Sequence, residues 1–465
     1  MYKNKSIFYD NRWYKSKSQN LFEYKNIKNK KILINNSNLK DIKRVIKSSE
    51  KSFNLWRNVS LSNRSKYLKK LSKILFKNRS LLAKKECFDT GKSFNQALSE
   101  INYCVKLWDH ASKELLNFHP KKVKIDNKTF CKIYNEPIGI ASVIVPWNFP
   151  LIVLSERLPY IIATGCVAIL KPSELASSSI IYFMNLIRKI GLPNGVVNLL
   201  TGDHTTGSIL IRQKKVKVIS FTGSTETGKK VMRIASSDLK RVSLELGGKN
   251  PFIVFNDANI NRAVKNCVVS FTHNSGQCCV GVSRVFVEEK IYKNFKKKLI
   301  ENLKKNKKLF QISNERQYLR VLKYLKMKNF NKNQILFGKI PNKKSKKLFL
   351  SPIVLTNINK NDDIHSSEMF SPIITLESFK EKINLIKTIN DSDYGLSCMI
   401  WSKNILQSLK FIKKIQIGRI WINGNITQNY PQIPIGGFKW SGIGRETGKS
   451  GFETYSEKKS IIVNN

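Results

Sequence analysis

The stretch of sequence from residue 139 to residue 172 reads GIASVIVPWNFPLIVLSERLPYIIATGCVAILKP. It begins and ends with short runs rich in β-branched residues, Ile140–Val145 and Val167–Leu170, and a helical stretch separates them. This order is typical of parallel strands joined by a crossover helix. A membrane span is excluded here, because Glu156 and Arg157 lie in the middle of the apolar region and prolines interrupt it.

The same alternation of strand and helix continues in two series along the chain. The strands expected in the first series, after the two already given, are Val196–Leu200, Val218–Phe221 and Val242–Leu244. Those expected in the second series are Phe252–Phe255, Val285–Val287, Ile353–Leu355, Met399–Trp401 and Ile420–Ile422. We therefore expect an α/β fold with two lobes.

Apolar residues recur at helical spacing before this region. Ile42, Val45 and Ile46 share one helical face, and Leu68 and Leu71 share another. We therefore expect the first hundred residues to be largely helical.

The net charge of +51 is the unusual bulk property. Such a balance ordinarily suggests nucleic acid as a partner, but the lysines are spread along the chain instead of being clustered on one arm or helix face. We therefore expect weak attraction to polyanions and no specific nucleic-acid site.

The eight cysteines form no Cys-x-x-Cys pair, no zinc-ligand spacing is present and no secretory signal opens the sequence, so we expect no metal and a cytoplasmic protein.

Two short motifs are suited to acyl chemistry. In Gly276-Gln277-Cys278-Cys279, small neighbours leave a thiol accessible ahead of a predicted strand, although paired cysteines are more often buried packing. Glu245 lies at the end of an apolar strand before two glycines, where a carboxylate of raised pKa can accept a proton from water. The alternative is a structural Glu that caps the next turn.

Three further motifs follow predicted strands. Asn148 lies between prolines and aromatics, where its amide can donate to an oxyanion or simply form a turn. The segments Lys171–Glu174 and Thr222–Gly228 each open a helix, and helix starts bind phosphate. The second segment is not the Gly-x-Gly-x-x-Gly fingerprint, so its glycines alone are a weak signal.

Together these motifs closely resemble those of the aldehyde dehydrogenase superfamily. The similarity extends from about Tyr9 to Ile462 and includes the closing run Pro434–Glu446 and the segment Glu368-Met369-Phe370. It implies two Rossmann-like lobes with parallel sheets plus a small oligomerisation hairpin. The implied ranges are 1–116 and 138–247 for a dinucleotide-binding domain, 248–445 for a catalytic domain, and 117–137 and 446–465 for bridging segments. A homodimer or homotetramer is expected.

The resemblance also implies roles for single residues. Cys279 matches the nucleophile, Glu245 the general base and Asn148 the oxyanion donor, which acts with the backbone N–H of Cys279. The positions implied for binding NAD, with NADP as an alternative, are Val145, Trp147, Lys171, Ser173, Glu174, Gly202, Gly223, Ser224, Leu246, Glu368 and Phe370. The positions implied for a substrate tunnel are Phe149, Val153, Glu156, His273, Cys278, Val280, Asn429 and Ile435.

The expected reaction is oxidation of an aldehyde to a carboxylic acid through a thioester. Glu156 is a carboxylate where relatives often carry an aromatic residue, so a small cationic aldehyde such as betaine aldehyde or an aminoaldehyde is the expected substrate. Two alternatives stay open: a CoA-acylating dehydrogenase, and a catalytically inactive protein that binds polyanions. Glu245 disfavours the first, because that branch commonly lacks the hydrolytic base, and the intact set of three catalytic residues disfavours the second.

Overall fold

The computed structural model describes residues 6–16, 18, 20–27, 30–305, 308–328, 330–341, 345, 347–359 and 362–464. The chain forms two compact units. Unit 1 comprises Met1–Leu244, Tyr430–Ile435 and Gly444–Asn465, and unit 2 comprises Glu245–Asn429 and Gly436–Ile443. Each unit contains a mainly parallel sheet with helices, which confirms the predicted α/β class.

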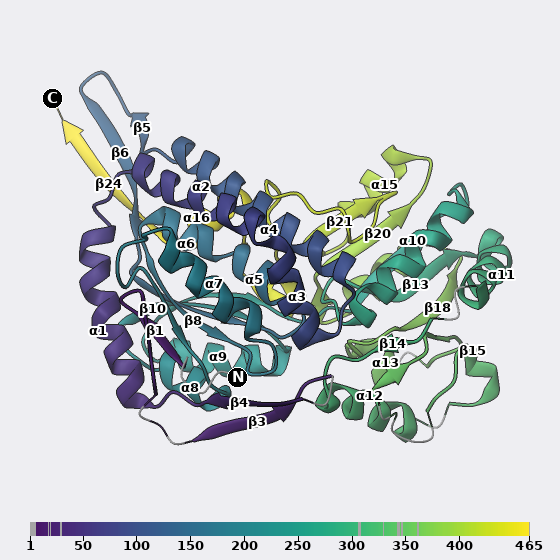
Figure 1. The fold of residues 1–465 in the computed structure, drawn as a ribbon. Helices are drawn as coiled ribbons and strands as arrows, with labels where there is room; N and C mark the ends of the chain where they lie inside the picture. The colour runs from purple at the N-terminus through teal and green to yellow at the C-terminus, as the bar shows by residue number, and fades with distance from the viewer. Residues whose placement is uncertain are drawn as a thin grey trace. The chain divides into compact units, whose positions relative to one another are not determined.

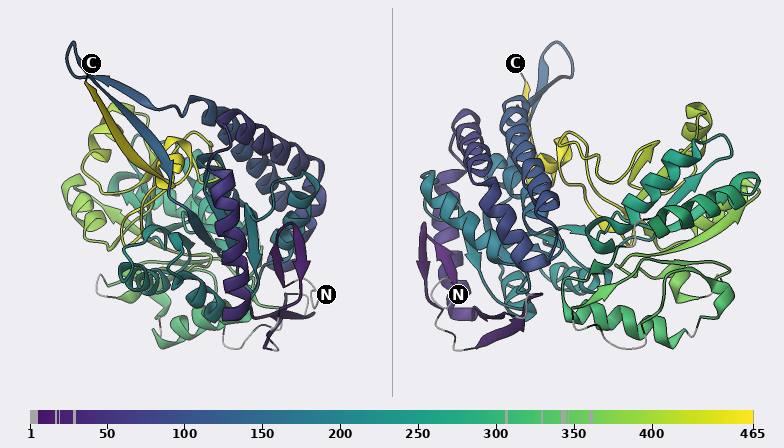
Figure 2. Two further views of the ribbon diagram at one scale, coloured as in Figure 1. Left: turned by 90° about the vertical axis from the view of Figure 1, so that its left-hand side faces the viewer. Right: turned by 45° about the vertical axis from the view of Figure 1, so that its right-hand side comes forward.

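Unit 1 begins with strands before its helices. Its first elements are β1 (Ile7–Tyr9), β2 (Arg12–Tyr14), β3 (Leu21–Lys25), β4 (Lys31–Asn35), α1 (Leu39–Trp56), α2 (Leu61–Lys77), α3 (Arg79–Thr90), α4 (Phe94–Glu114) and η1 (Leu115–Asn117). The four helices confirm the helical spacing, and α2 packs along α4 (Figure 2). The expectation of helix was wrong for the segments that form β1 to β4. In β4, buried Ile32 and Ile34 alternate with more exposed neighbours at the period of a strand.

The rest of unit 1 alternates strand and helix, as predicted. Its elements are β5 (Lys121–Lys124), β6 (Thr129–Pro137), β7 (Ile140–Val145), α5 (Pro150–Ser155), α6 (Leu158–Thr164), β8 (Val167–Pro172), α7 (Ser178–Lys189), β9 (Val197–Leu200), α8 (His204–Ile211), β10 (Val216–Thr222), α9 (Thr225–Ser236), β11 (Arg241–Glu245, whose last residue belongs to unit 2), α16 (Gly448–Thr454) and β24 (Ser456–Asn464).

The main sheet of unit 1 has the strand order β2-β1-β9-β8-β7-β10-β11. Strands β7 to β10 are parallel, with Ile140 opposite both Val167 and Val216. After β7 the chain proceeds first to β8 and β9 on one side, and then to β10 and β11 on the other. This reversal places a topological switch point beside the carboxyl end of β7, which is where open α/β sheets bind ligands.

A separate three-stranded sheet in unit 1 has the order β24-β6-β5. The carboxy-terminal strand β24, yellow in Figure 1, runs antiparallel to β6 over its whole length, from Ser456 opposite Pro137 to Asn464 opposite Thr129. Residues from both ranges expected to be bridging segments, 117–137 and 446–465, therefore lie in one sheet.

Unit 2 continues the alternation of strand and helix. Its elements are β12 (Asn250–Val254), α10 (Ile260–Thr272), η2 (His273–Gly276), β13 (Val282–Glu288), α11 (Glu289–Lys305), β14 (Phe310–Gln311), α12 (Glu315–Met327), η3 (Lys332–Gln334), β15 (Ile335–Phe337), β16 (Phe349–Leu350), β17 (Ile353–Leu355), α13 (Asp363–Ser366), β18 (Ile373–Phe379), α14 (Lys382–Asn390), β19 (Tyr394–Gly395), β20 (Ser397–Trp401), α15 (Ile405–Ile412), β21 (Arg419–Ile422), β22 (Phe438–Lys439) and β23 (Gly442–Ile443). The sheet order is β15-β17-β18-β13-β12-β20-β21.

All neighbouring strands of this sheet are parallel except β15, which pairs antiparallel with β17. The amino ends of β12, β13 and β18 therefore meet at one edge. The segments that precede these three strands contain Gly247–Gly248, Cys278–Cys279 and Glu368–Phe370. The parallel topology thus gathers three motifs that are far apart in the sequence.

Candidate active site

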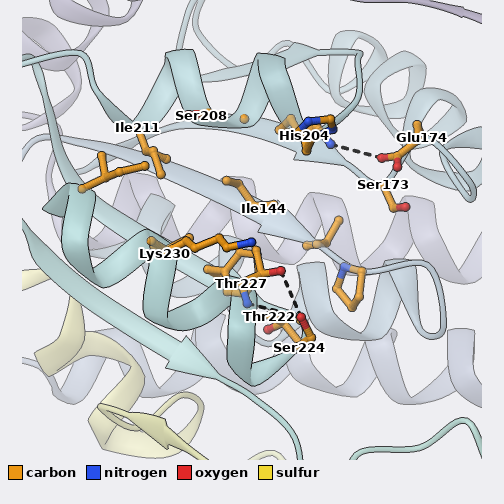
Figure 3. A pocket seen from close by; sticks show the side chains of 18 of the residues that line it. Ile144, Ser173, Glu174, His204, Ser208, Ile211, Thr222, Ser224, Thr227 and Lys230 are labelled. Carbon is orange, nitrogen blue, oxygen red and sulfur yellow. Dashed lines mark hydrogen bonds and ion pairs between the residues drawn. The ribbon is translucent and has the colours of Figure 1, made fainter. Parts of the chain in front are cut away.

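A pocket of about 590 Å³ lies in unit 1 at the switch point of the main sheet (Figure 3). Its walls are the segments that follow β7, β8 and β10, together with the facing sides of α8 and α9. The lining residues named in the sequence analysis are Val145, Trp147, Lys171, Ser173, Glu174, Gly223 and Ser224. The structure therefore brings together seven of the residues expected to bind a dinucleotide.

Lys171 and Glu174 form an ion pair at one end of this pocket, with 3.4 Å between Nζ and Oε2. Lys171 is buried, and burial lowers the pKa of its ammonium while Glu174 opposes that change. Glu174 lies beside Ser173 and His204 in Figure 3. A carboxylate and a hydroxyl next to each other suit the hydroxyls of a ribose.

The opposite wall contains the amino terminus of α9. Ser224 is the N-cap of this twelve-residue helix, and its Oγ accepts a hydrogen bond from the backbone N–H of Thr227 at 3.3 Å. The residue before it is a glycine because a Cβ on Gly223 would overlap the ring of Phe221. The helix amino terminus has a partial positive charge and is suited to a pyrophosphate.

One expected cofactor residue is not among the lining residues of this pocket, and the lining includes residues that the sequence analysis did not name. Gly202 does not line the pocket: it packs against Thr206 and Asn36 at the turn before α8. Sequence reasoning missed the pocket residues on the two helices, among them His204, Arg212 and Lys230. The only signal in the sequence for these residues is that α8 and α9 directly follow the strands β9 and β10, because helices that follow parallel strands can line a ligand pocket.

In unit 2, Cys279 lies in a tight turn ahead of β13. Asn274, Ser275 and Gly276 all have left-handed backbone conformations, with φ of 49°, 60° and 70°. Asn250 Nδ2 donates to the carbonyl oxygens of Cys279 at 2.6 Å and Gly281 at 2.8 Å. Strained residues held firmly by their surroundings are common at functional sites, and here they fix the backbone on both sides of the thiol.

Two carboxylates act electrostatically on this thiol. A hydrogen bond with Cys278, together with burial, raises the pKa of Cys279 well above its ordinary value, and the charges of Glu245 and Glu368 add to this effect. Glu368 Oε1 accepts a hydrogen bond from the backbone N–H of Gly248 at 3.1 Å. Burial raises the pKa of Glu368 to about 7. Glu245 is itself buried, at 6% exposure, as expected for a base in an apolar pocket.

Phe370 and Leu246 are the remaining cofactor positions in unit 2. Gln317 Nε2 donates to the carbonyl oxygen of Phe370 at 2.9 Å, and the backbone N–H of Leu246 donates to the carbonyl of Ser441 at the same distance. The expected cofactor residues therefore divide between the units: Leu246, Glu368 and Phe370 belong to unit 2, and the others to unit 1.

Asn148 and the expected tunnel residues are likewise divided between the units. Unit 1 contains Asn148, Phe149, Val153, Glu156 and Ile435, whereas unit 2 contains His273, Cys278, Val280 and Asn429. Glu156 pairs with its neighbour Arg157, with 3.4 Å between Oε2 and Nη1. Asn429 Oδ1 accepts from Arg419 at 3.1 Å, and Ile435 forms a β-bridge with Glu446.

None of the helices within the described ranges is long and apolar enough to cross a membrane. In the same part of the chain, no cluster of three or more His, Cys, Asp or Glu side chains is arranged to hold a metal ion.

Comparison with known sequences gives matches over nearly the whole chain. Residues 13–461 match the model of the aldehyde dehydrogenase family. Aldehyde dehydrogenase 1A1 of Gallus gallus is 33% identical over 475 residues, which cover 98% of this chain and 93% of that protein. Retinaldehyde dehydrogenase 3 of Homo sapiens is 33% identical, with coverage of 98% and 92%.

Comparison with solved structures agrees. The NAD-dependent aldehyde dehydrogenase of Sinorhizobium meliloti superposes with a TM-score of 0.93 at 30% identity, covering 99% of this chain and 94% of that one. Betaine aldehyde dehydrogenase of Staphylococcus aureus in complex with NAD+ gives a TM-score of 0.93 at 29% identity, with coverage of 99% and 95%.

Proposed function

Since this chain belongs to the aldehyde dehydrogenase family, we propose that it oxidises an aldehyde to a carboxylic acid with NAD, in the cytoplasm, through a thioester on Cys279. The observation that carries the proposal is the arrangement in unit 2, where Cys279 lies within electrostatic range of Glu245 and Glu368. A thiol near two carboxylates, one of them a candidate base, is what acyl transfer to water requires.

The residues of unit 1 fit a dinucleotide. The pocket at the switch point offers a carboxylate and a hydroxyl for the adenosine ribose, in Glu174 and Ser173, and the amino terminus of α9 for the pyrophosphate. Glu174 would repel a 2′-phosphate, so NAD is preferred over NADP, although its ion pair with Lys171 reduces that repulsion. NAD, when bound, supplies the acceptor for the hydride.

The side chains of this chain perform the other steps. Cys279 gives its proton to solvent, and the thiolate attacks the carbonyl carbon of the aldehyde, which forms a C–S bond and moves the carbonyl π electrons onto the oxygen as negative charge. The amide of Asn148 and the backbone N–H of Cys279 donate hydrogen bonds to that oxyanion. When the hydride has left, the C=O bond forms again and the acyl group remains on Cys279 as a thioester. Glu245 then takes a proton from water, which attacks the thioester, releases the acid and restores the thiol.

We predict that Cys279→Ala abolishes turnover and that Glu245→Gln allows acylation but stalls deacylation. The nucleophile is needed for both half-reactions, whereas the base is needed only to activate water. Rapid-quench measurement should show one equivalent of NADH per site in Glu245→Gln, followed by slow turnover. Normal steady-state turnover in either variant would contradict the mechanism. If CoA, and not water, restores turnover, the enzyme is of the CoA-acylating type.

We also propose that the substrate is a small polar aldehyde, and specifically a cationic one such as betaine aldehyde or an aminoaldehyde. The support is the carboxylate at Glu156 and the similarity to the betaine aldehyde dehydrogenase of Staphylococcus aureus. Glu156 already pairs with Arg157, so a substrate ammonium would share that carboxylate.

The substrate proposal predicts that Glu156→Gln lowers kcat/KM for a cationic aldehyde about tenfold and leaves a neutral aldehyde of equal length nearly unchanged. A charge-assisted hydrogen bond contributes about 1.5–3 kcal/mol, and part of this is lost to the competition with Arg157. The measurement is the ratio of kcat/KM for the two aldehydes in both proteins. An equal ratio would show that Glu156 does not recognise the cation.

A further inference from the structure

Lys92 is a fully buried lysine in the loop between α3 and α4. Its Nζ lies 2.6 Å from Glu100 Oε2 and 3.6 Å from Glu86 Oε2, and it donates to the backbone carbonyl oxygen of Asn148 at 2.9 Å. It also lies 4.6 Å from the centre of the Phe149 ring. The ammonium thus uses one of its three N–H donors in a hydrogen bond to Asn148, the residue proposed to bind the oxyanion.

The surroundings of Lys92 hold it in one position. Gln96 Nε2 donates to Glu100 Oε1 at 2.9 Å, and Ser179 Oγ donates to Glu86 Oε1 at 2.6 Å. Although burial alone lowers it, the two carboxylates raise the pKa of Lys92, which keeps the ammonium charged. A buried charge with hydrogen-bonded partners is costly to move, so this cluster is rigid.

The turn at Asn148 is held on both sides by this cluster. It leads into α5, whose N-cap Phe149 has no side chain that can cap the helix, and Pro150 has no N–H. Glu86 Oε1 accepts the backbone N–H of Leu151 at 3.4 Å. The same cluster therefore holds both sides of this turn. Lys92 binds the carbonyl oxygen of Asn148, and Glu86 binds the backbone N–H of Leu151, the first N–H after Pro150.

We propose that Lys92 is a positioning residue for Asn148: its hydrogen bond to the Asn148 carbonyl fixes the peptide from which the oxyanion-donating amide projects. The inference rests on the proposed role of Asn148. A misplacement of about 1 Å costs roughly a hundredfold in rate, and the loss of one oxyanion donor costs about a hundred- to a thousandfold. Loss of the Lys92 bond should therefore cost less than loss of the Asn148 amide.

The test is a double-mutant cycle of Lys92→Met and Asn148→Ala, with kcat/KM for propionaldehyde as the readout. We expect Lys92→Met to lower kcat and kcat/KM together by about ten- to a hundredfold, since the interaction matters in the transition state. In the Asn148→Ala background the same change should have almost no effect, because there is no amide left to position. A purely structural lysine would lower the activity equally in both backgrounds, and that result would overturn the proposal.

Two controls separate loss of positioning from a general effect of removing a buried lysine and from failure to fold. Lys240→Met removes another buried lysine, which donates to the Gln213 carbonyl at 2.6 Å and pairs with Asp238, and it should leave kcat/KM unchanged. If Lys92→Met does not fold, the triple variant with Glu86→Gln and Glu100→Gln leaves no unpaired buried charge and replaces it in the cycle. Full activity of Asn148→Ala would overturn both this inference and the proposed role of Asn148, whereas additive losses would overturn only the inference.

Discussion

Among single residues, Cys278 has the largest influence on the proton affinity of its neighbour. The hydrogen bond between the two side chains is the largest of the effects that raise the pKa of Cys279, ahead of burial. We predict that Cys278→Ala lowers the pKa of Cys279, because the contact that favours the neutral thiol disappears. The rate of alkylation by iodoacetamide, measured across pH, should then reach half its maximum at a lower pH than in the wild type.

The control for this prediction is Cys267→Ala. Cys267 is buried in α10, and burial alone raises its pKa. Its removal should leave the alkylation profile in place. An unchanged profile in Cys278→Ala would contradict the assigned contact. Turnover should persist in Cys278→Ala, since only Cys279 occupies the nucleophile position.

The residues proposed to be catalytic are easier to find in the sequence than the residues that support them. Cys279 and Glu245 stand in short motifs whose residue types suggest their chemistry. Lys92 is one lysine among many, and its bond to Asn148 joins residues 56 positions apart. His204 likewise reaches the pocket only because α8 packs beside the switch point. Contacts of this kind depend on the tertiary fold, which residue type and spacing do not encode locally.

At the scale of elements, the turn before β13 depends on Gly276. Its φ is 70°, and a Cβ there would overlap the backbone of Ser371 and Pro372, which precede β18. We predict that Gly276→Ala lowers the free energy of unfolding by about 2–4 kcal/mol, from the unfavourable conformation and the overpacking together. It should also lower kcat, because the displaced segment includes Glu368 and Phe370.

Gly191 is the matched control for this substitution. Its φ is 69°, but no atom lies within 4 Å of the position of a Cβ. Gly191→Ala should therefore cost only the conformational part, about 1 kcal/mol. Urea denaturation of the two variants separates strain from overlap, and equal losses would show that the contact with Ser371 is unimportant.

The central strands were predictable because each is a short, buried apolar run, as in β7 and β12. The four amino-terminal strands were not, because each is at most five residues long and β2, β3 and β4 mix apolar with polar residues. Strand β18 was also missed. Thr375, Glu377 and Ser378 interrupt the apolar residues of its sequence IITLESF, so periodicity alone did not separate it from the loop after Phe370.

At the scale of the whole molecule, we predict a dimer or tetramer that depends on β24. This strand bonds to β6 on one side, and Ile461 and Ile462 on it are 43% and 67% exposed. An exposed strand at a sheet edge is a template for pairing with another copy. Ile462→Lys should lower the mass measured by light scattering, whereas Leu406→Lys on α15, also exposed, should not. A monomeric wild type at micromolar concentration would contradict the prediction.

The route of the chain between the units has a consequence for synthesis on the ribosome. Unit 1 is built from three separate segments, and the last begins at Gly444, after unit 2 has been completed at Ile443. Buried Arg157 lies 3.6 Å from Glu446, and Tyr455 and Ser243 donate to the same carboxylate. During translation, about 290 residues are added between this arginine and its carboxylate partner, which takes roughly 15–60 s at 5–20 residues per second. Unit 1 therefore begins to emerge from the ribosome first but is completed last. A nascent chain truncated before residue 446 lacks the buried ion pair between Arg157 and Glu446.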